Sequence, residues 1–219
     1  VRIWNPDGSV AEKSGNGLRI FAWWWSVHRG GGPAFGLEVA GTVVGCEVAG
    51  QIVDVEIGQA TFVAAEIPVD RARIDQPIDL GAETLDVVTV GVGNPHCVVF
   101  RTEVDLDALP WHRWGERLER HPAFPNRTNV QVARVVGPHQ LALRVWERGA
   151  GPTLASGSSA CAVAAAAVRT GRIEPGVVTV EMPGGALTVT VRDDYRLRLR
   201  GPVAPVGRFE ADPDWTLTS

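Results

Sequence analysis

Cysteine is scarce in this sequence, and its spacing excludes two kinds of small protein. The 219 residues contain three cysteines, and none of them belongs to a CxxC pair. They are Cys46, Cys97 and Cys161. Three residues so far apart form neither a disulfide framework nor a cysteine-based metal site. We therefore expect a reduced, cytoplasmic protein that holds no metal ion.

Long apolar runs and an excess of one charge are also absent. The most hydrophobic stretch, residues 20–25, is much shorter than the ~20 residues that span a bilayer, and Arg19 and His28 flank it. The chain has 21 Lys and Arg against 25 Asp and Glu, a net charge of −4. A nucleic-acid-binding domain shows a basic excess instead. We therefore expect neither a membrane nor a nucleic acid as a partner.

The patterns that are present predict a mixed α+β protein. Hydrophobic residues make up 45% and charged residues 21%, as in ordinary globular domains. Helices are predicted over residues 17–28, over residues 105–120 with Asp105 as N-cap, and over an alanine-rich run that ends at Gly171. Valine-rich segments between turn residues predict strands. These segments are residues 35–63, 85–90, 97–100, 129–136, 141–146, 177–182, 187–191 and 195–200.

Two segments far apart in the chain place small polar residues before an apolar helix. They read "AEKSGNGLRIFAWWW" and "TLASGSSACAVAAAA", so residues 14–16 and 156–158 occupy equivalent places. A helix start exposes unpaired N–H groups and partial positive charge, and glycine lets an anion approach them. Serine is also a favoured N-cap, so simple helix capping is the alternative. The similarity of the two segments predicts two lobes, each with strands around a central helix.

Three further motifs place polar side chains at the ends of predicted strands. "GNPHCVVF" puts Asn94 and His96 in a turn, and "RTNVQVA" puts Asn129 where a strand begins. In "ERGAG", Glu147 and Arg148 follow an apolar strand and can bind the ammonium and carboxylate groups of an amino acid. Each motif also has a structural interpretation: a buried histidine, a capping asparagine, or an exposed ion pair.

Together with "NPDGSVAEKSGNGLRIFA" and "FPNRTNVQVA", these motifs resemble the diaminopimelate epimerase family, a relative of the proline racemases and phenazine-biosynthesis isomerases. The resemblance spans nearly the whole chain. It implies an α+β fold of two pseudo-symmetric lobes, each a strongly curved, mostly antiparallel sheet around a central helix. We expect the first lobe over residues 1–65, incomplete at its N-terminus and completed by about residues 205–219. The second lobe is expected over residues 66–204.

The resemblance also implies a reaction and the residues that perform it. Family members invert the α-carbon of an amino acid with two cysteines on opposite faces, whose positions here hold Ser14 and Ser156, and they need no cofactor. His96 and Glu147 would tune these groups. A homodimer that interconverts LL- and meso-diaminopimelate for lysine and peptidoglycan precursors is expected. The small-molecule substrate would contact Asn5, Gly15, Asn16, Asn94, Asn129, Glu147, Arg148, Gly157 and Ser158.

Serine at both positions leaves other functions open. If the pKa of an alcohol lies about five units above that of a thiol, generating the base costs roughly 7 kcal/mol more, or about five decades of rate. The chain can therefore be an impaired epimerase, an isomerase or dehydratase of the same fold with one-sided proton transfer, or a non-catalytic amino-acid-binding protein. A serine hydrolase using Ser156 and His96 is disfavoured, because the sequence has no G-x-S-x-G motif.

Overall fold

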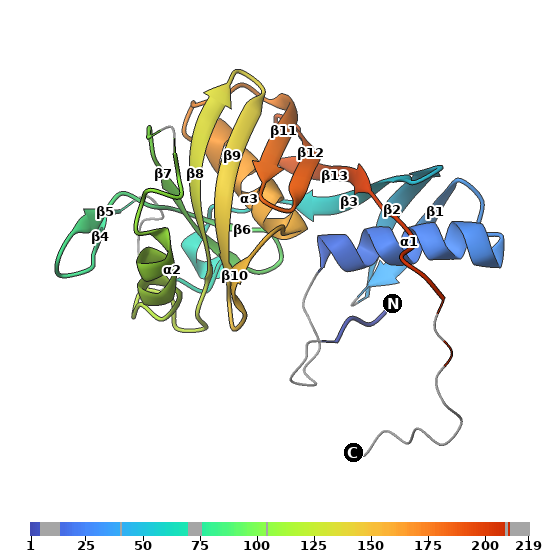
Figure 1. Cartoon of the computed structure of the whole chain (residues 1–219), viewed down its shortest axis with the longest axis horizontal. Helices are drawn as coiled ribbons and strands as arrows, with labels where there is room; N and C mark the ends of the chain where they lie inside the picture. Colours follow the sequence, from blue (N-terminus) through green and yellow to red (C-terminus); the bar gives the residue numbers. More distant parts are fainter. Residues whose placement is uncertain (5–13, 40, 70–75, 104, 209, 211–219) are drawn as a thin grey trace, which may run out of the picture.

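A computed structural model describes residues 1–4, 14–39, 41–69, 76–103, 105–208 and 210 (Figure 1). Asn5 and residues 211–219 lie outside the described residues. The helices are α1 (Gly15–Arg29), α2 (Trp111–Glu119) and α3 (Gly157–Arg169), with a short 3-10 helix at Ala64–Glu66. The strands are β1 (Ala34–Val39), β2 (Thr42–Ala49), β3 (Ile52–Gln59), β4 (Ile78–Asp79), β5 (Thr84–Leu85), β6 (Val88–Gly91), β7 (Pro95–Phe100), β8 (Asn129–Gly137), β9 (Gln140–Glu147), β10 (Gly151–Thr153), β11 (Gly176–Met182), β12 (Gly185–Val191) and β13 (Arg196–Pro202).

One large sheet organises the fold. Its order is β1-β2-β3-β13-β12-β11-β9-β8-β7-β6, with β10 added alongside β9. Only the β7–β8 and β9–β11 pairs among these strands are parallel, so the predicted α+β class with a mostly antiparallel sheet is confirmed. β13 pairs with β3, with Leu199 opposite Val55, and this pair joins the region of α1 to the region of α3 (Figure 1). The lobe boundary at residues 65 and 66 stays a prediction.

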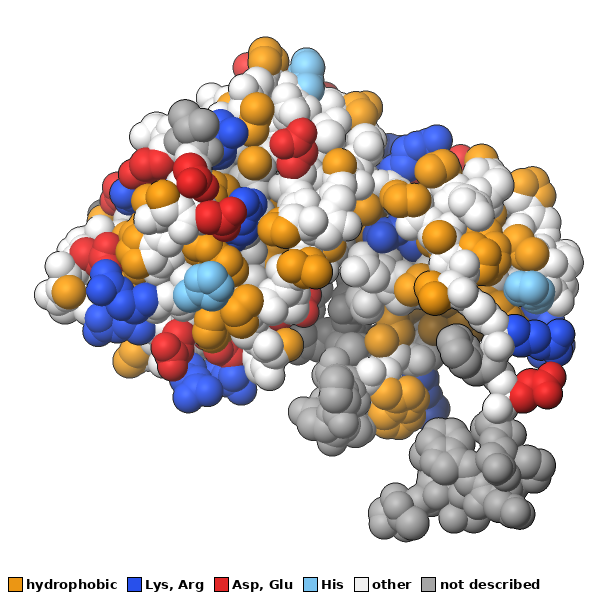
Figure 2. Space-filling model, in the orientation of Figure 1, with side chains coloured by type: hydrophobic (Ala, Val, Ile, Leu, Met, Phe, Trp, Pro, Cys, Tyr) orange, Lys and Arg blue, Asp and Glu red, His pale blue; other side chains and the backbone are white. Residues whose placement is uncertain are grey.

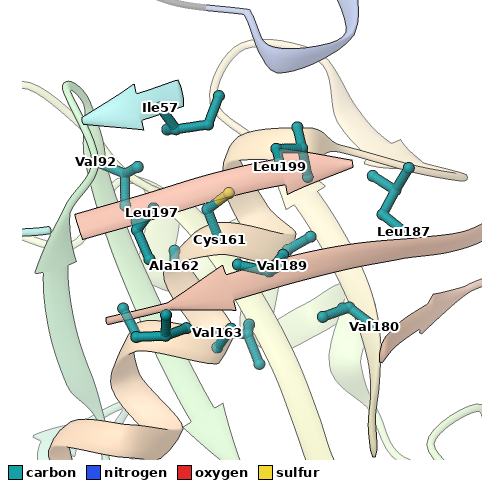
Figure 3. Packing of buried hydrophobic residues seen from close by; sticks show 14 of the residues in the cluster. Ile57, Val92, Cys161, Ala162, Val163, Val180, Leu187, Val189, Leu197 and Leu199 are labelled. Atoms are coloured by element: carbon teal, nitrogen blue, oxygen red, sulfur yellow. The ribbon is translucent and has the colours of Figure 1, made fainter. Parts of the chain in front are cut away.

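Helix α3 lies at the centre of the curved part of this sheet. Alanine is the best helix former and has a small side chain, so a run of alanines makes a narrow helix that strands can surround closely. Every residue from Ala160 to Ala167 is fully buried. Cys161, Ala162 and Val163 lie against side chains of β11, β12 and β13 (Figure 3). Because the strands enclose the alanine run, they also hold the first turn of α3 in a defined position.

Helix α2 covers the opposite face of the sheet, and its start differs from the prediction. The strand β7 alternates between two cores: Val98 packs with the α3 core, whereas Cys97 and Val99 pack with the α2 core. Both faces of β7 are thus covered. The expected N-cap Asp105 is wrong, because α2 begins at Trp111 and the Asp105 carboxylate accepts instead from the Asp107 N–H at 2.9 Å. A local Asx turn therefore replaces the predicted cap.

Helix α1 packs on β2 and β3 with one side only. Leu18 and Ala22 are fully buried, whereas Ile20 is 57% exposed and Val27 is 53% exposed. Its C-terminus is closed by Gly30 in the left-handed conformation at φ 67°, which glycine adopts without strain. Within the described part of the chain, no helix is long and apolar enough to cross a membrane. Acidic and basic side chains are interspersed on the face shown in Figure 2.

Candidate active site

The N-termini of α1 and α3 meet glycine to glycine. A Cβ built on Gly15 would lie 3.3 Å from the Cα of Gly157, and one built on Gly157 would lie 3.3 Å from the Cα of Gly15. Either Cβ would also lie 2.8 Å from Leu199 Cδ2. Two helices can approach this closely only where both lack side chains. The contact therefore brings Ser14 and Ser156, the residues just before these glycines, to one place.

The hydroxyl groups of Ser14 and Ser156 differ in their bonding. Both serines are the N-caps of their helices and have extended backbones. Ser14 Oγ accepts from the Gly17 N–H at 3.0 Å, which is ordinary helix capping. Ser156 makes no side-chain capping bond, and its Oγ lies 3.4 Å from Ser158 Oγ although the residue is only 5% exposed. Capping thus explains the serine at position 14 but not the one at position 156.

Positive charge converges where the two helices meet. Each helix N-terminus has a partial positive charge from its aligned peptide dipoles. The buried Arg19 adds a guanidinium that donates to two uncharged oxygens, the Gly15 carbonyl at 3.4 Å and Asn16 Oδ1 at 3.1 Å. Burial lowers the pKa of Arg19, because it removes water from the charged form, and a nearby Cys161 opposes that shift. This region therefore favours an anionic ligand.

A chain of side-chain hydrogen bonds links the "GNPH" turn to the first turn of α3. His96 Nε2 lies 2.9 Å from Asn94 Oδ1, and His96 Nδ1 lies 3.1 Å from Gln131 Nε2. Gln131 Nε2 also donates to Ser159 Oγ at 3.0 Å. With these amide orientations, His96 is the neutral tautomer that carries its proton on Nε2. The predicted residues Asn94 and His96 are thus connected to α3 through Gln131 and Ser159, which were not among the predicted site residues.

The buried environment keeps His96 neutral. Burial lowers its pKa to about 3, since the charged ring would lose its hydration; the Gln131 bond opposes this shift, and the Arg148 charge adds to it. Both ring nitrogens are occupied by amide side chains. His96 therefore acts in this structure as a hydrogen-bonding link toward Ser159, and its action on Ser14 or Ser156 stays a prediction.

Gln131 could have been recognised from the sequence by its alternation with Asn129. Successive residues of a strand point to opposite faces, so Asn129 and Gln131 share one face of β8. Val130 and Val132 point to the α2 core on the other face. Two fully or almost fully buried amides on one face of an apolar strand need polar partners. That alternation indicates a polar network, which no single motif reveals.

Asn129 holds the "ERGAG" turn in place. Its Nδ2 donates to the Pro95 carbonyl at 3.0 Å, and its Oδ1 accepts from the Arg148 N–H at 3.0 Å. Arg148 Nη1 also donates to the carbonyl of Asn126 at 3.3 Å. Glu147 is half-buried at the end of β9, directly opposite Gly151. The structure thus brings Asn94, Asn129 and Arg148 into one region, and their contacts with a substrate stay a prediction.

The cysteines and the metal-binding residue types form no further centre among the described residues. Cys46, Cys97 and Cys161 are all buried. Burial raises the pKa of Cys46 to about 11, and the Glu56 charge adds to the rise. No group of three or more His, Cys, Asp or Glu in the described part of the chain is arranged to hold a metal ion.

A cavity of about 640 Å³ opens beside the "GNPH" turn. Its lining residues include Asn94, Pro95, Thr61, Phe62 and Tyr195. It shares Asn94 with the hydrogen-bond chain, but neither Ser14 nor Ser156 lines it. The cavity therefore adjoins the polar network and is separate from the meeting point of the two helices.

Solved structures of other proteins have the same fold as this chain. A probable proline racemase from Agrobacterium radiobacter K84, solved with bound carbonate, superposes with a TM-score of 0.69 at 14% identity, over 97% of this chain and 72% of that one. A hydroxyproline epimerase from Agrobacterium vitis, solved with bound trans-4-hydroxy-L-proline, superposes with a TM-score of 0.64 at 14% identity, over 92% of this chain and 66% of that one. The chain therefore shares the fold of these two proteins.

Sequence comparison then identifies the family. The family described as diaminopimelate epimerase matches residues 88–204. Diaminopimelate epimerase 2 of Nostoc sp. (strain PCC 7120) is 39% identical over 96% of this chain and 75% of its own length. The diaminopimelate epimerase of Synechococcus sp. (strain JA-3-3Ab) is 41% identical over 94% of this chain and 75% of its own length. The chain belongs to the diaminopimelate epimerase family, so the predicted resemblance and the assignment as an isomerase are confirmed.

Proposed function

We propose that the chain inverts the α-carbon of diaminopimelate by two-sided proton transfer, with Ser14 and Ser156 at the two transfer positions. The single observation that supports this most is the contact of Gly15 with Gly157, which brings both serines to one place from two different helices. Inversion requires a base on one face of the carbon and an acid on the other. The base removes the α-proton and the acid returns one from behind, so substrate and product differ only in configuration.

The charge distribution supports the binding of an amino acid at this point. The first-turn N–H groups of α1 and α3 can donate to a carboxylate, and glycine allows its close approach. The Arg19 guanidinium donates to the Gly15 carbonyl and to Asn16 Oδ1, so it adds positive charge beside these residues. The same field stabilises the negative charge that develops when the α-proton leaves. Arg148, held by Asn129, is the further cation of the proposed site.

Serine makes the reaction slow. If its pKa lies about five units above that of a thiol, the handicap is roughly 7 kcal/mol. The two positions also differ, because Ser14 Oγ already caps α1 while Ser156 Oγ has no capping bond. We therefore assign Ser156 the weaker structural constraint and the greater freedom to exchange a proton with the substrate.

We also infer the location, the oligomeric state and the pathway of the protein. The protein acts as a cytoplasmic homodimer, without a cofactor, in the supply of lysine and peptidoglycan precursors. Two alternatives share its fold: an isomerase with one-sided proton transfer, and an amino-acid-binding protein without catalysis. Deuterium incorporation at the α-carbon in D₂O separates the three functions. Two-sided transfer gives deuterium with inversion, one-sided transfer gives deuterium without inversion, and binding without catalysis gives no deuterium.

The decisive experiment restores thiols at the two positions. The Ser14→Cys/Ser156→Cys variant should epimerise LL-diaminopimelate faster than the unmodified protein by orders of magnitude, because both faces then hold a group of suitable acidity. Each single variant should gain far less, since the two groups act as a unit. The measurement is α-deuterium incorporation and chirality in D₂O, by mass spectrometry after chiral separation.

The matched control keeps two added thiols and moves one of them. Ser14→Cys/Ser158→Cys places the second thiol two residues further along α3, where it should not reach the rate of the first pair. If the folded Ser14→Cys/Ser156→Cys variant binds the substrate and exchanges no α-proton, the helix starts only bind anions and the proposed mechanism is wrong.

A further inference from the structure

Glu119 is a buried carboxylate that no sequence motif predicted. It is the last residue of α2, and its side chain is only 4% exposed. Its Oε1 accepts from the Gly149 N–H at 2.8 Å, and its Oε2 accepts from the indole N–H of Trp146 at 2.9 Å. Oε1 also forms an ion pair with Arg127 Nη2. One carboxylate therefore has three donors from two segments of the chain.

Two of these donors flank the Glu147–Arg148 pair in the chain. Trp146 precedes the pair and Gly149 follows it, so Glu119 fixes both ends of this short turn. The second segment holds Arg148 as well, because Asn129 accepts from its N–H and the carbonyl of residue 126 accepts from its guanidinium. The Glu119 carboxylate pairs with Arg127 inside that segment, and the backbone carbonyl of Glu119 accepts from the N–H of residue 128 at 3.2 Å. The carboxylate thus joins the two segments that hold Arg148.

Stabilisation of α2 does not explain a charge at this position. The C-terminus of a helix carries partial negative charge, so a carboxylate there is unfavourable for the helix itself. Burial costs further free energy and raises the pKa of Glu119, but the bonds from Trp146, Gly149 and Arg127 outweigh it and leave the pKa lowered. The side chain is therefore charged at neutral pH, and its favourable contacts all lie outside α2.

We infer that Glu119 is a positioning residue that holds the Glu147–Arg148 turn in the conformation that binds the charged groups of the amino-acid substrate. This inference rests on the proposed function only for the identity of the ligand. The ordering of the turn by Glu119 can be tested without any ligand.

The first test measures amide hydrogen exchange, by mass spectrometry, in Glu119→Gln and in its control Glu116→Gln. Glu116 lies one turn earlier on the exposed side of α2. Replacing the carboxylate with an amide removes the charge and one acceptor oxygen, so exchange at residues 147–150 should rise at least about tenfold. Exchange in α3 should not change in either variant. Trp146→Phe, which removes one donor and keeps an aromatic ring, should give a smaller rise in the same peptides.

The second test measures the affinity for diaminopimelate by calorimetry. Glu119→Gln should weaken binding about tenfold or more, and Glu116→Gln should not change it. If Glu119 acts through the turn, its effect should largely disappear in the Arg148→Ala background, because the two changes then remove the same interaction. A merely structural role predicts equal losses in both backgrounds.

The outcomes separate this inference from the proposed function. Unchanged exchange at residues 147–150 in both Glu119→Gln and Trp146→Phe would overturn the positioning role. An equal rise throughout α2 would overturn it too, because Glu119 would then only stabilise its helix. A rise confined to the turn supports it even if the unmodified protein does not bind diaminopimelate, which would count against the proposed function alone.

Discussion

Replacement of each N-cap serine with alanine should affect stability very differently. In Ser14→Ala, the Gly17 N–H loses the Oγ acceptor that lies 3.0 Å away. In Ser156→Ala, no capping bond is lost, and the hydroxyl removed lies 3.4 Å from Ser158 Oγ. Both changes remove the same atom from the same position of a helix. The difference between them therefore measures the capping bond.

The structure sets the size of this difference. Loss of a serine N-cap costs about 0.5–2 kcal/mol, typically ~1 kcal/mol. A hydroxyl pair at 3.4 Å is at the outer limit of hydrogen bonding, so its loss should cost less than about 0.5 kcal/mol. For a chain of this length, 1 kcal/mol corresponds to roughly 2–4 °C in Tm. Ser14→Ala should therefore melt a few degrees below Ser156→Ala.

Urea unfolding followed by far-UV circular dichroism gives the free energies, and thermal melts give the Tm values. Ser26→Ala on the same helix removes a hydroxyl that donates to the Gly32 carbonyl at 2.7 Å, so it shows the cost of losing a serine hydrogen bond away from the N-cap. Equal destabilisation by Ser14→Ala and Ser156→Ala would refute the reasoning, because the Ser156 hydroxyl would then have a structural role that the geometry does not provide.

Two further predictions concern the buried histidine and the glycine contact. The pKa of His96 is about 3 in the folded protein against an ordinary 6.5, so the unfolded chain takes up the proton first and stability falls as pH drops from 6.5 toward 3. The slope due to His96 should approach about 1.4 kcal/mol per pH unit, and His96→Gln should reduce it in urea titrations between pH 7 and pH 5; an unchanged slope would contradict the neutral state. Gly157→Ala should destabilise by about 1–3 kcal/mol, because the new Cβ would lie 2.8 Å from Leu199 Cδ2 and 3.3 Å from Gly15 Cα. Gly137→Ala is the control, because a Cβ at that position would lie 3.9 Å from its nearest neighbouring atoms, and it should be tolerated in the same thermal melts. Similar losses of stability in Gly157→Ala and Gly137→Ala would show that Gly157 and Gly15 are not in close contact.

The sequence alone determined the features that depend on local chemistry. The helix predicted over residues 17–28 exists as α1, and the alanine-rich run exists as α3. Helix α1 begins directly after Ser14, whose hydroxyl caps it, and α3 begins directly after Ser156, where a run of strong helix formers follows. Both signals act within a few residues of the chain. The strands predicted over residues 129–136 and 141–146 are β8 and β9. The motifs also sufficed to identify the family.

Where local signals compete, the prediction from sequence was wrong or incomplete. Asp105 can cap a helix, but it can equally form an Asx turn, and the burial of Trp111 and Trp114 against the sheet places the start of α2 at residue 111. The short strand β10 depends on pairing with β9 and has no periodicity of its own. Such choices are made by tertiary packing.

Only the tertiary structure showed how the predicted site residues are held together and which further residues join them. Gly15 and Gly157 are distant in sequence, and their contact results from the pairing of β3 with β13, which joins the regions that hold α1 and α3. Glu119 and Gln131 carry no motif, because a buried polar residue is defined by partners that come from other parts of the chain. Capping, turns and helix propensity act over a few residues and can be recognised in the sequence. Burial, and the low dielectric that keeps His96 neutral, arise only when distant segments pack together.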